Sequence, residues 1–173
     1  IRNMTESNPV RISVIIPCHN EEESIATVVQ TCRAALAAPE DEVIVVDDGS
    51  TDGTAAAAAA AGAHVERFET NQGKGIALVA GARASRGGVL VFLDGDGQDD
   101  PRELPTLLAA LEPGVDMVIG SRFLGTLHSG SIHPLNRLAN RAFSGLISVL
   151  FGQRITDSQA GFRILRRGAF LAL

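Results

Sequence analysis

Short apolar runs recur along the chain, and they are continuous rather than interrupted by alternating polar residues. Four of them are rich in β-branched side chains and cover residues 11–16, 43–46, 89–93 and 116–120. Continuous runs of this kind are typical of strands buried on both faces, as in a parallel sheet packed between helices. The segment HVERF (64–68) is interpreted as a further strand between the second and third runs.

Helical segments separate the predicted strands. They are expected at residues 21–37, 54–61, 74–85 and 102–111. The alternation of strand and helix predicts right-handed crossovers, and hence an α/β fold with a doubly wound, Rossmann-like, mostly parallel sheet that carries helices on both faces. Asn20 and Glu23 are predicted to cap the first helix, and Gly62 is predicted to end the second after its alanine run.

Length, composition and charge limit the class of protein. With 173 residues, 45% of them hydrophobic, the chain can form one core, and residues 11–173 are expected to be a single domain after a flexible arm at 1–10. The net charge of -5 gives no electrostatic basis for a general nucleic-acid-binding role. Cys18 and Cys32 lack metal-ligand spacing and are expected to be reduced, as in a cytoplasmic protein.

The last ten residues, ILRRGAFLAL, are interpreted as the beginning of an apolar helix with no stop signal, so the protein is expected to continue beyond Leu173. No stretch approaches the roughly 20 apolar residues that are needed to span a bilayer.

Polar clusters follow directly after three of the predicted strands. They are PCHNEE (17–22), DDGS (47–50) and DGDGQ (94–98). Ligands of open α/β sheets bind outside the carboxyl ends of the strands, near the point where the strand order reverses. The three clusters are therefore expected to line one crevice.

The segment DGDGQDDP (94–101) is the strongest candidate for a metal site. In a chain that stays extended after Leu93, Asp94, Asp96 and Gln98 would alternate onto one face. Their carboxylate and amide oxygens would be hard ligands suited to Mg2+ or Mn2+, and such a cation could bridge a diphosphate.

Two known motifs and a capping turn are the alternatives for the segment 94–101. It lacks the glycine and glutamate that an EF-hand loop requires, and it lacks the third glycine of a dinucleotide-binding fingerprint. The simplest structural alternative is an acidic turn in which Asp99 or Asp100 caps the next helix ahead of Pro101. Capping would leave the two earlier aspartates unexplained at the end of a buried strand.

Two further loops carry candidate binding residues. Of the adjacent carboxylates Asp47 and Asp48, we predict that Asp48 accepts a hydrogen bond from the nucleobase while the other holds the loop, and that a residue within 50–52 caps the following helix. In NQGKG (71–75), Gly73 and Lys74 precede a helix whose N-terminus favours anions. A glycine-rich turn with a solvated lysine is the alternative there.

Six ordered motifs together resemble the family 2 glycosyltransferases of GT-A fold, and among these the branch of dolichyl-phosphate mannosyltransferase and bacterial polyprenyl-phosphate glycosyltransferases. The motifs are VIIPCHNEEESI, VIVVDDGSTDGT, NQGKGIAL, FLDGDGQDDP, GSRF and DSQAGFRILRR. The similarity covers nearly the whole chain from about Arg11. One departure is Gly95 and Gly97, where mannosyltransferases more often carry alanine and a bulkier residue.

The resemblance implies transfer of a hexose, with inversion, from a nucleotide-diphosphate sugar of the GDP-mannose or UDP-glucose type. It also implies Mg2+ or Mn2+ on Asp94, Asp96 and Gln98, with Asp96 essential for transfer. The donor site is accordingly expected to include Pro17, Asn20, Glu21, Asp48, Gly73, Lys74, Asp94 and Gly95.

The acceptor implied by the resemblance is a polyprenyl phosphate, which needs cationic hydrogen-bond donors. The candidates are Arg122, Arg137, Asn140, Arg141 and Arg163. Arg122 and Asp157 are also expected near the reacting centre, where Asp157 would position or deprotonate the acceptor. A solvated basic face is the alternative for these arginines.

A lipid acceptor implies peripheral contact with the cytoplasmic face of a membrane, and the apolar segment 142–151 is consistent with such a surface or with a core helix. The sequence leaves open a homo-oligomer, a soluble or polysaccharide acceptor, a sugar nucleotidyltransferase, and a non-catalytic module that binds nucleotide-sugars.

Overall fold

The computed structural model describes residues 11–120 and 161–172 of the chain. The arm predicted at 1–10 and the segment 142–151 lie outside the described residues. The helices and strands given for this protein belong to residues 11–120 and 161–172.

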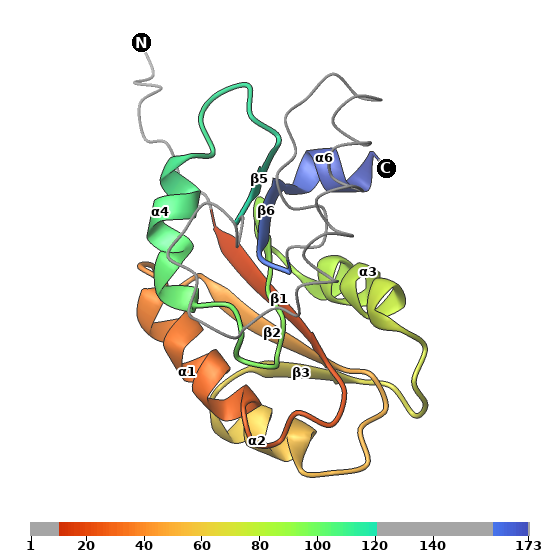
Figure 1. The fold of residues 1–173 in the computed structure, drawn as a ribbon. Helices are drawn as coiled ribbons and strands as arrows, with labels where there is room; N and C mark the ends of the chain where they lie inside the picture. The colour runs from red at the N-terminus through yellow and green to blue at the C-terminus, as the bar shows by residue number, and fades with distance from the viewer. Residues whose placement is uncertain (1–10, 121–160, 173) are drawn as a thin grey trace, which may run out of the picture.

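Six strands form a single sheet in the order β3-β2-β1-β4-β6-β5 (Figure 1). Their bounds are Ile12–Cys18 (β1), Glu42–Asp47 (β2), His64–Arg67 (β3), Val89–Phe92 (β4), Met117–Ile119 (β5) and Arg163–Arg166 (β6). β1, β2, β3 and β4 are mutually parallel, whereas β6 runs antiparallel to both β4 and β5. The predicted mostly parallel, doubly wound sheet is confirmed.

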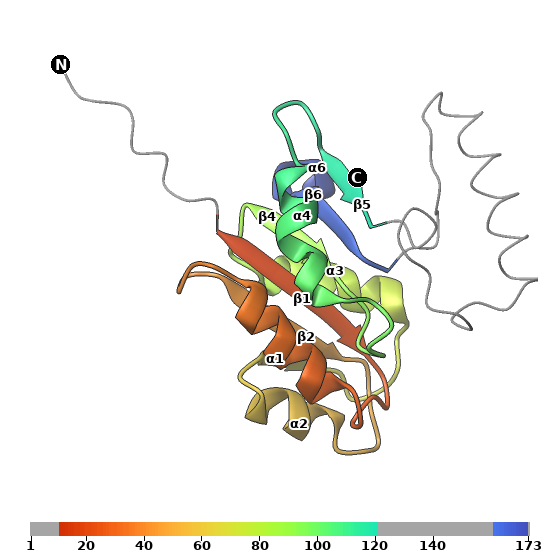
Figure 2. The same ribbon diagram turned by 60° about the vertical axis from the view of Figure 1, so that its left-hand side comes forward.

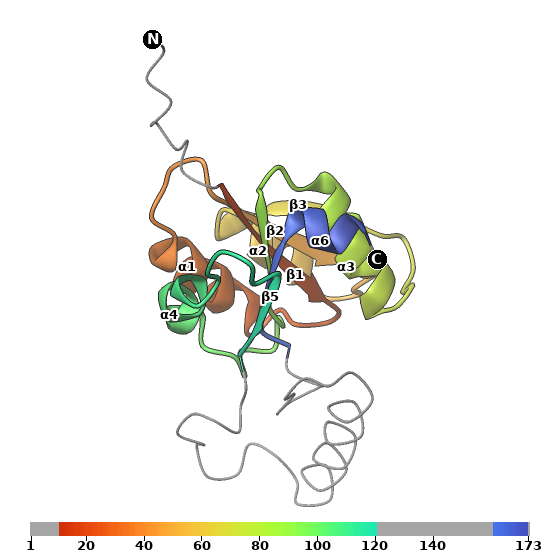
Figure 3. The same cartoon turned by 90° about the horizontal axis from the view of Figure 1, so that it is seen from above.

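Helices cover both faces of this sheet. They are α1 (Ile25–Ala35), α2 (Thr54–Ala60), α3 (Lys74–Ala84), the 3-10 helix η1 (Pro101–Glu103), α4 (Leu104–Ala109) and α6 (Arg167–Leu171). Figure 2 shows α1, α2 and α4 together in front of the sheet, and the view from above separates them from α3 and α6 on the other side (Figure 3). None of the described helices is long and apolar enough to cross a membrane.

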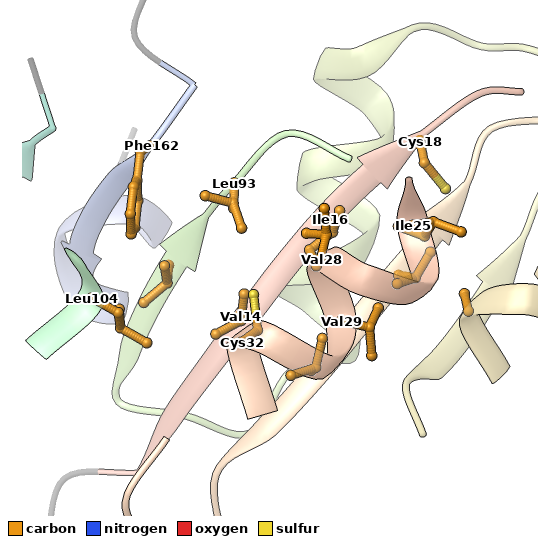
Figure 4. Close-up of a cluster of buried hydrophobic side chains, with 14 of the residues drawn as sticks. Val14, Ile16, Cys18, Ile25, Val28, Val29, Cys32, Leu93, Leu104 and Phe162 are labelled. Atoms are coloured by element: carbon orange, nitrogen blue, oxygen red, sulfur yellow. The ribbon is translucent and has the colours of Figure 1, made fainter. Parts of the chain in front are cut away.

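The core has two halves because each central strand is apolar on both faces. Val14, Ile16 and Cys18 of β1 pack with α1 on one side, where Figure 4 shows the cluster extending to Leu104 and Phe162. Ile15 belongs to the other half, between the sheet and α3. The period of two along a strand thus divides a continuous apolar run between two helical layers.

Two predictions about the ends of the elements are wrong. β6 replaces the first part of the predicted terminal helix, because residues 163–166 pair with β4 and β5, and a helix, α6, begins only at Arg167. The first helix begins at Ile25 rather than at residue 21, and its N-cap is Ser24 without a side-chain capping bond. The predicted Asn20–Glu23 cap is therefore not formed. Gly62, with φ of 92°, does follow α2 as predicted.

Candidate donor-binding site

A cleft of about 280 Å³ opens at the carboxyl ends of β1, β2 and β4. β1 pairs with β2 on one side and with β4 on the other, so the chain order reverses at β1, as expected for a ligand site in an open α/β sheet. The lining residues are Pro17, Cys18, His19, Glu21, Asp48, Asn71, Gly73, Lys74, Asp94, Gly95 and Asp96.

The loop after β1 is fixed by hydrogen bonds to the loop after β2. Asn20 has φ of 57°, and its side-chain Oδ1 accepts a hydrogen bond from the N–H of Thr51 at 2.9 Å. Its own N–H donates to the Oγ of Ser50. Asn20 thus holds the cleft wall together instead of lining the cleft, although the sequence placed it in the donor site.

The two adjacent aspartates after β2 both anchor loops. Asp47 is fully buried, accepts from the N–H of Ser50 at 2.9 Å and lies 3.2 Å from the Nε of Arg67. Although this separation makes the pair an ion pair, Oδ2 of Asp47 receives no hydrogen bond of good geometry. The anchoring of this loop was predicted for one of the two aspartates.

Asp48 is 4% exposed, and its two oxygens accept hydrogen bonds from the N–H groups of Gln72 (2.7 Å) and Gly73 (2.8 Å). This clamp fixes the turn that leads into α3. A Cβ on Gly49, whose φ is +74°, would lie 2.6 Å from the backbone of the same turn, so the two loops are in direct contact. A carboxylate oxygen can accept more than one hydrogen bond, so Asp48 retains acceptor capacity toward the cleft.

Opposite charges face each other across the cleft. Nζ of Lys74, the first residue of α3, lies 2.6 Å from Oδ1 of Asp94, which follows β4. Asp96 lies in the same lining, and its Oδ1 accepts a hydrogen bond from the N–H of Gln98. Among the described residues that line the cleft, Lys74 is the only lysine or arginine, whereas Glu21, Asp48, Asp94 and Asp96 contribute four carboxylates.

The segment after β4 does not stay extended. Residues 95 and 96 form a turn, and Gly97 has φ of +77°. The predicted alternation onto one face is therefore wrong, and Gln98 lies along a neighbouring groove with Thr27 and Arg102 instead of in the cleft. The predicted cap is formed by Asp100, whose carboxylate accepts from the N–H of Arg102. The side-chain hydrogen bond from Arg102 lowers the pKa of Asp100.

A distant part of the sequence completes the wall beside Asp94. A Cβ on Gly161 would lie 2.5 Å from Oδ2 of Asp94 and 2.8 Å from Oδ2 of Asp99. Real Cβ atoms do not approach so closely, so only glycine allows this contact without displacing a carboxylate. The neighbours of this glycine are therefore the carboxylates of the acidic turn after β4.

The local electrostatic environment is strongly negative. Burial, together with the charges of Asp96 and Asp94, raises the pKa of Glu21 despite the hydrogen bond from Ser24. Burial and the neighbouring Asp47 raise the pKa of the Cys18 thiol to about 12. Such a field disfavours a bare anion and favours a cation.

The carboxylate oxygens of Asp94 and Asp96 are ligands of the kind that Mg2+ and Mn2+ prefer. The negative electrostatic field around Glu21 also favours a divalent cation. Within the described residues, however, no three His, Cys, Asp or Glu side chains form a ready metal site. A cation here would need further oxygens, as Mg2+ commonly takes from the phosphates of a substrate.

The structure brings eight of the predicted site residues into one cleft, namely Pro17, Glu21, Asp48, Gly73, Lys74, Asp94, Gly95 and Asp96. Arg163 begins β6, opposite Phe92 of β4. Arg122, Arg137, Asn140, Arg141 and Asp157 lie outside the described residues. The lining also includes Cys18, His19 and Asn71, which sequence reasoning did not select. Cys18 and His19 belong to the cluster PCHNEE (17–22), and Asn71 begins the motif NQGKG (71–75), so these motifs were the available signal.

The fold and this cleft define a GT-A glycosyltransferase domain. The sequence profile of the family "Glycosyl transferase family 2" matches residues 13–173, and the chain belongs to that family. The family that the resemblance of the motifs predicted is therefore confirmed.

Several relatives have related names. The chain is 36% identical to an undecaprenyl-phosphate mannosyltransferase of Micrococcus luteus over 95% of this chain and 70% of the relative. It is 38% identical to a polyprenol monophosphomannose synthase of Mycolicibacterium smegmatis (91% and 62%), and 35% identical to the glycosyltransferase AglJ of Haloferax volcanii (94% and 52%). The chain thus spans only part of these relatives, about half of the last.

Solved structures share the fold. Glucosyl-3-phosphoglycerate synthase from Mycobacterium tuberculosis, in complex with Mn2+, uridine diphosphate and glucosyl-3-phosphoglycerate, superimposes with a TM-score of 0.77 at 27% identity. The match covers 95% of this chain and 60% of the synthase. A mannosyl-3-phosphoglycerate synthase from Rubrobacter xylanophilus has the same fold, with a TM-score of 0.76 over 95% of this chain and 55% of that synthase, at 23% identity.

Proposed function

We propose that this glycosyltransferase moves a hexose from a nucleoside-diphosphate sugar, of the GDP-mannose or UDP-glucose type, to a polyprenyl phosphate with inversion at the anomeric carbon. The reaction depends on Mg2+ or Mn2+. The observation that carries the donor half is the cleft itself, in which one lysine faces four carboxylates at the ends of β1, β2 and β4. The polyprenyl-phosphate half is supported by the names of the Micrococcus and Mycolicibacterium relatives.

The acidic cleft explains why a cation is part of the proposal. A diphosphate would be repelled by Glu21, Asp94 and Asp96 unless positive charge balanced them. Asp94 and Asp96 would hold the cation. When bound, it supplies Lewis-acid neutralisation of the diphosphate leaving group.

The protein's own residues bind and orient the reactants. Lys74 is positioned to contact the diphosphate, because it begins α3 at the cleft and its ammonium reaches the end of β4. Asp48 accepts from the nucleobase, and the turn that it clamps at Gln72 and Gly73 holds the start of α3.

Transfer itself is a displacement at the anomeric carbon. An oxygen of the acceptor phosphate forms the new bond while the bond to the donor diphosphate breaks. A phosphate monoester is substantially ionised near neutral pH, with a second pKa of about 6, so it needs no strong base. Asp157 positions the acceptor or removes its remaining proton, and Arg122, Arg137, Asn140, Arg141 and Arg163 bind its phosphate. A lipid acceptor places the protein at the cytoplasmic face of a membrane, with peripheral contact.

The test is calorimetric titration of a panel of nucleotide-sugars with and without Mn2+, followed by transfer of radiolabelled sugar to polyprenyl phosphate. We expect Mn2+-dependent binding of one donor and recovery of the label in the lipid extract. Asp96→Asn should abolish both metal-dependent donor binding and transfer. If no nucleoside diphosphate bound under either condition, the proposal would be wrong.

A soluble acceptor is the second candidate. It is favoured by the likeness to glucosyl-3-phosphoglycerate synthase, whose name specifies a small phosphorylated acceptor. The two candidates share the donor chemistry and differ in where the labelled product goes. With 3-phosphoglycerate offered as acceptor, a labelled product that stays in the aqueous phase, and no label in lipid, would support the second candidate over the first.

A further inference from the structure

The ion pair between Lys74 and Asp94 spans the cleft. It joins the first residue of α3 to the second residue after the strand β4, with Nζ and Oδ1 2.6 Å apart. The side chains are 55% and 31% exposed, so the pair lies at the mouth of the cleft rather than in the core. An ion pair of this exposure contributes little to folding stability.

Both carboxylate oxygens of Asp94 lie close to neighbouring groups. Its Oδ1 is bound to Lys74, and its Oδ2 faces Gly161, where even a Cβ would come within 2.5 Å. A divalent cation that binds Oδ1 of Asp94 shares that oxygen with the ammonium group. Two cations on one carboxylate repel each other, so binding of the metal weakens the hold of Asp94 on Lys74.

The lysine can move while its backbone stays fixed. The turn before it is clamped by Asp48 through the N–H groups of Gln72 and Gly73, so the start of α3 has a defined position. The side chain has a flexible four-carbon stem and a compact charge. Movement of the stem alone brings the ammonium group from Asp94 to an anion in the same cleft.

On the basis of the proposed function, we propose that Lys74 exchanges partners during donor binding, leaving Asp94 for the diphosphate as the divalent cation takes Asp94. Lys74 is then a counter-ion of the acidic cleft in one arrangement and a diphosphate ligand in the other. The exchange couples the two ligands, because the cation releases the lysine that the diphosphate requires and the diphosphate gives that lysine a new partner.

The variant Lys74→Met tests the exchange by calorimetry with two probes on the whole chain. The first is Mn2+ alone, whose affinity should rise roughly two- to fivefold, because a competitor for Asp94 is gone. The second is GDP or UDP at saturating Mn2+, whose affinity should fall about tenfold or more, because a charge-assisted bond to the diphosphate is lost. Arg83→Met is the matched control, since it removes an exposed cation near the other end of α3.

Opposite shifts for the two probes, absent from Arg83→Met, support the exchange. Unchanged or weakened Mn2+ binding in Lys74→Met would overturn it, because Lys74 would then not compete at Asp94. Unchanged nucleotide binding would also overturn it, because the lysine would have no second partner. In both cases the proposed function stands if the unaltered protein binds a nucleoside diphosphate with Mn2+. If the unaltered protein binds none, the proposed function fails and the exchange fails with it.

Discussion

Replacing Gly161 by alanine should damage the donor site while leaving the fold nearly intact. The added Cβ would lie 2.5 Å from Oδ2 of Asp94, whereas ordinary van der Waals contact begins near 3.4 Å, so that oxygen must recede by about 0.9 Å. Oδ2 of Asp99 lies 2.8 Å from the same position. The φ of Gly161 is outside the left-handed range. Steric contact with these two carboxylates, and not backbone strain, therefore disfavours alanine at this position.

The displacement has different effects on binding and on stability. Metal ligands must keep their distances within about 0.2 Å, and a shift of about 1 Å in a reacting group can cost roughly 100-fold in rate. We therefore expect Gly161→Ala to weaken Mn2+-dependent binding of GDP or UDP by at least about tenfold. The atoms that yield are the ends of two side chains, so the free energy of unfolding should change by no more than about 1 kcal/mol, at the low end of overpacking costs.

Calorimetry with Mn2+ and nucleotide, beside urea unfolding, measures the two effects separately. Gly168→Ala is the control, because it adds the same methyl group in α6, where no described atom outside the neighbouring residues and the helix backbone lies within 4 Å of the added Cβ. It should bind the nucleotide as the unaltered protein does. If Gly161→Ala also bound nucleotide normally, the contact with Gly161 would not determine the position of Asp94.

Three further changes test the cleft walls. Asp48→Asn should lower the hydrogen-exchange protection of the Gln72 and Gly73 amides and destabilise the protein by about 1–3 kcal/mol in urea unfolding. Asparagine offers one uncharged oxygen where the carboxylate offers one charged oxygen to each of the two N–H groups. Unchanged protection would contradict the clamp. Cys18 should resist iodoacetamide at pH 8 until the protein unfolds, because a pKa of about 12 leaves only about one thiolate in 10,000. Rapid alkylation in the folded protein would contradict that pKa. Gly95→Ala should be tolerated within about 1 kcal/mol in unfolding, since its Cβ would lie 3.2 Å from the Cβ of Cys18, and a larger loss would show that the wall cannot yield.

Most of the sheet could be predicted because its signal is local. The runs at β1, β2 and β4 are apolar on both faces, and that pattern appears in the sequence itself. β6 was missed because its pairing with β4 and β5 depends on residues far away in the chain. Its sequence, RILR, carries two arginines that also suit a helix end.

That the loops after β1, β2 and β4 line one cleft could be predicted from the rule for strand ends. The conformations of these loops could not. The turn after β4 depends on positive φ at Gly97 and on the hydrogen bond from Gln98 to Asp96. With this turn, Gln98 lies along the neighbouring groove and not in the cleft, and alternation along an extended chain could not predict the turn. Likewise, the loop at Asn20 delays the start of α1, because its polar groups bond to the loop after β2.

The large sequence separation between β4 and β6 has a consequence for the order of folding. β1 to β4 are joined by short crossovers, whereas Arg163 pairs with Phe92 across a long sequence separation. Contacts between distant residues form slowly, because the intervening chain must first be closed into a loop. We therefore expect the sheet from β1 to β4 to form first and β6 to dock later. The contact between Gly161 and the acidic turn would then form only late in folding, so partly folded chains would have Asp94 and Asp99 without this neighbour.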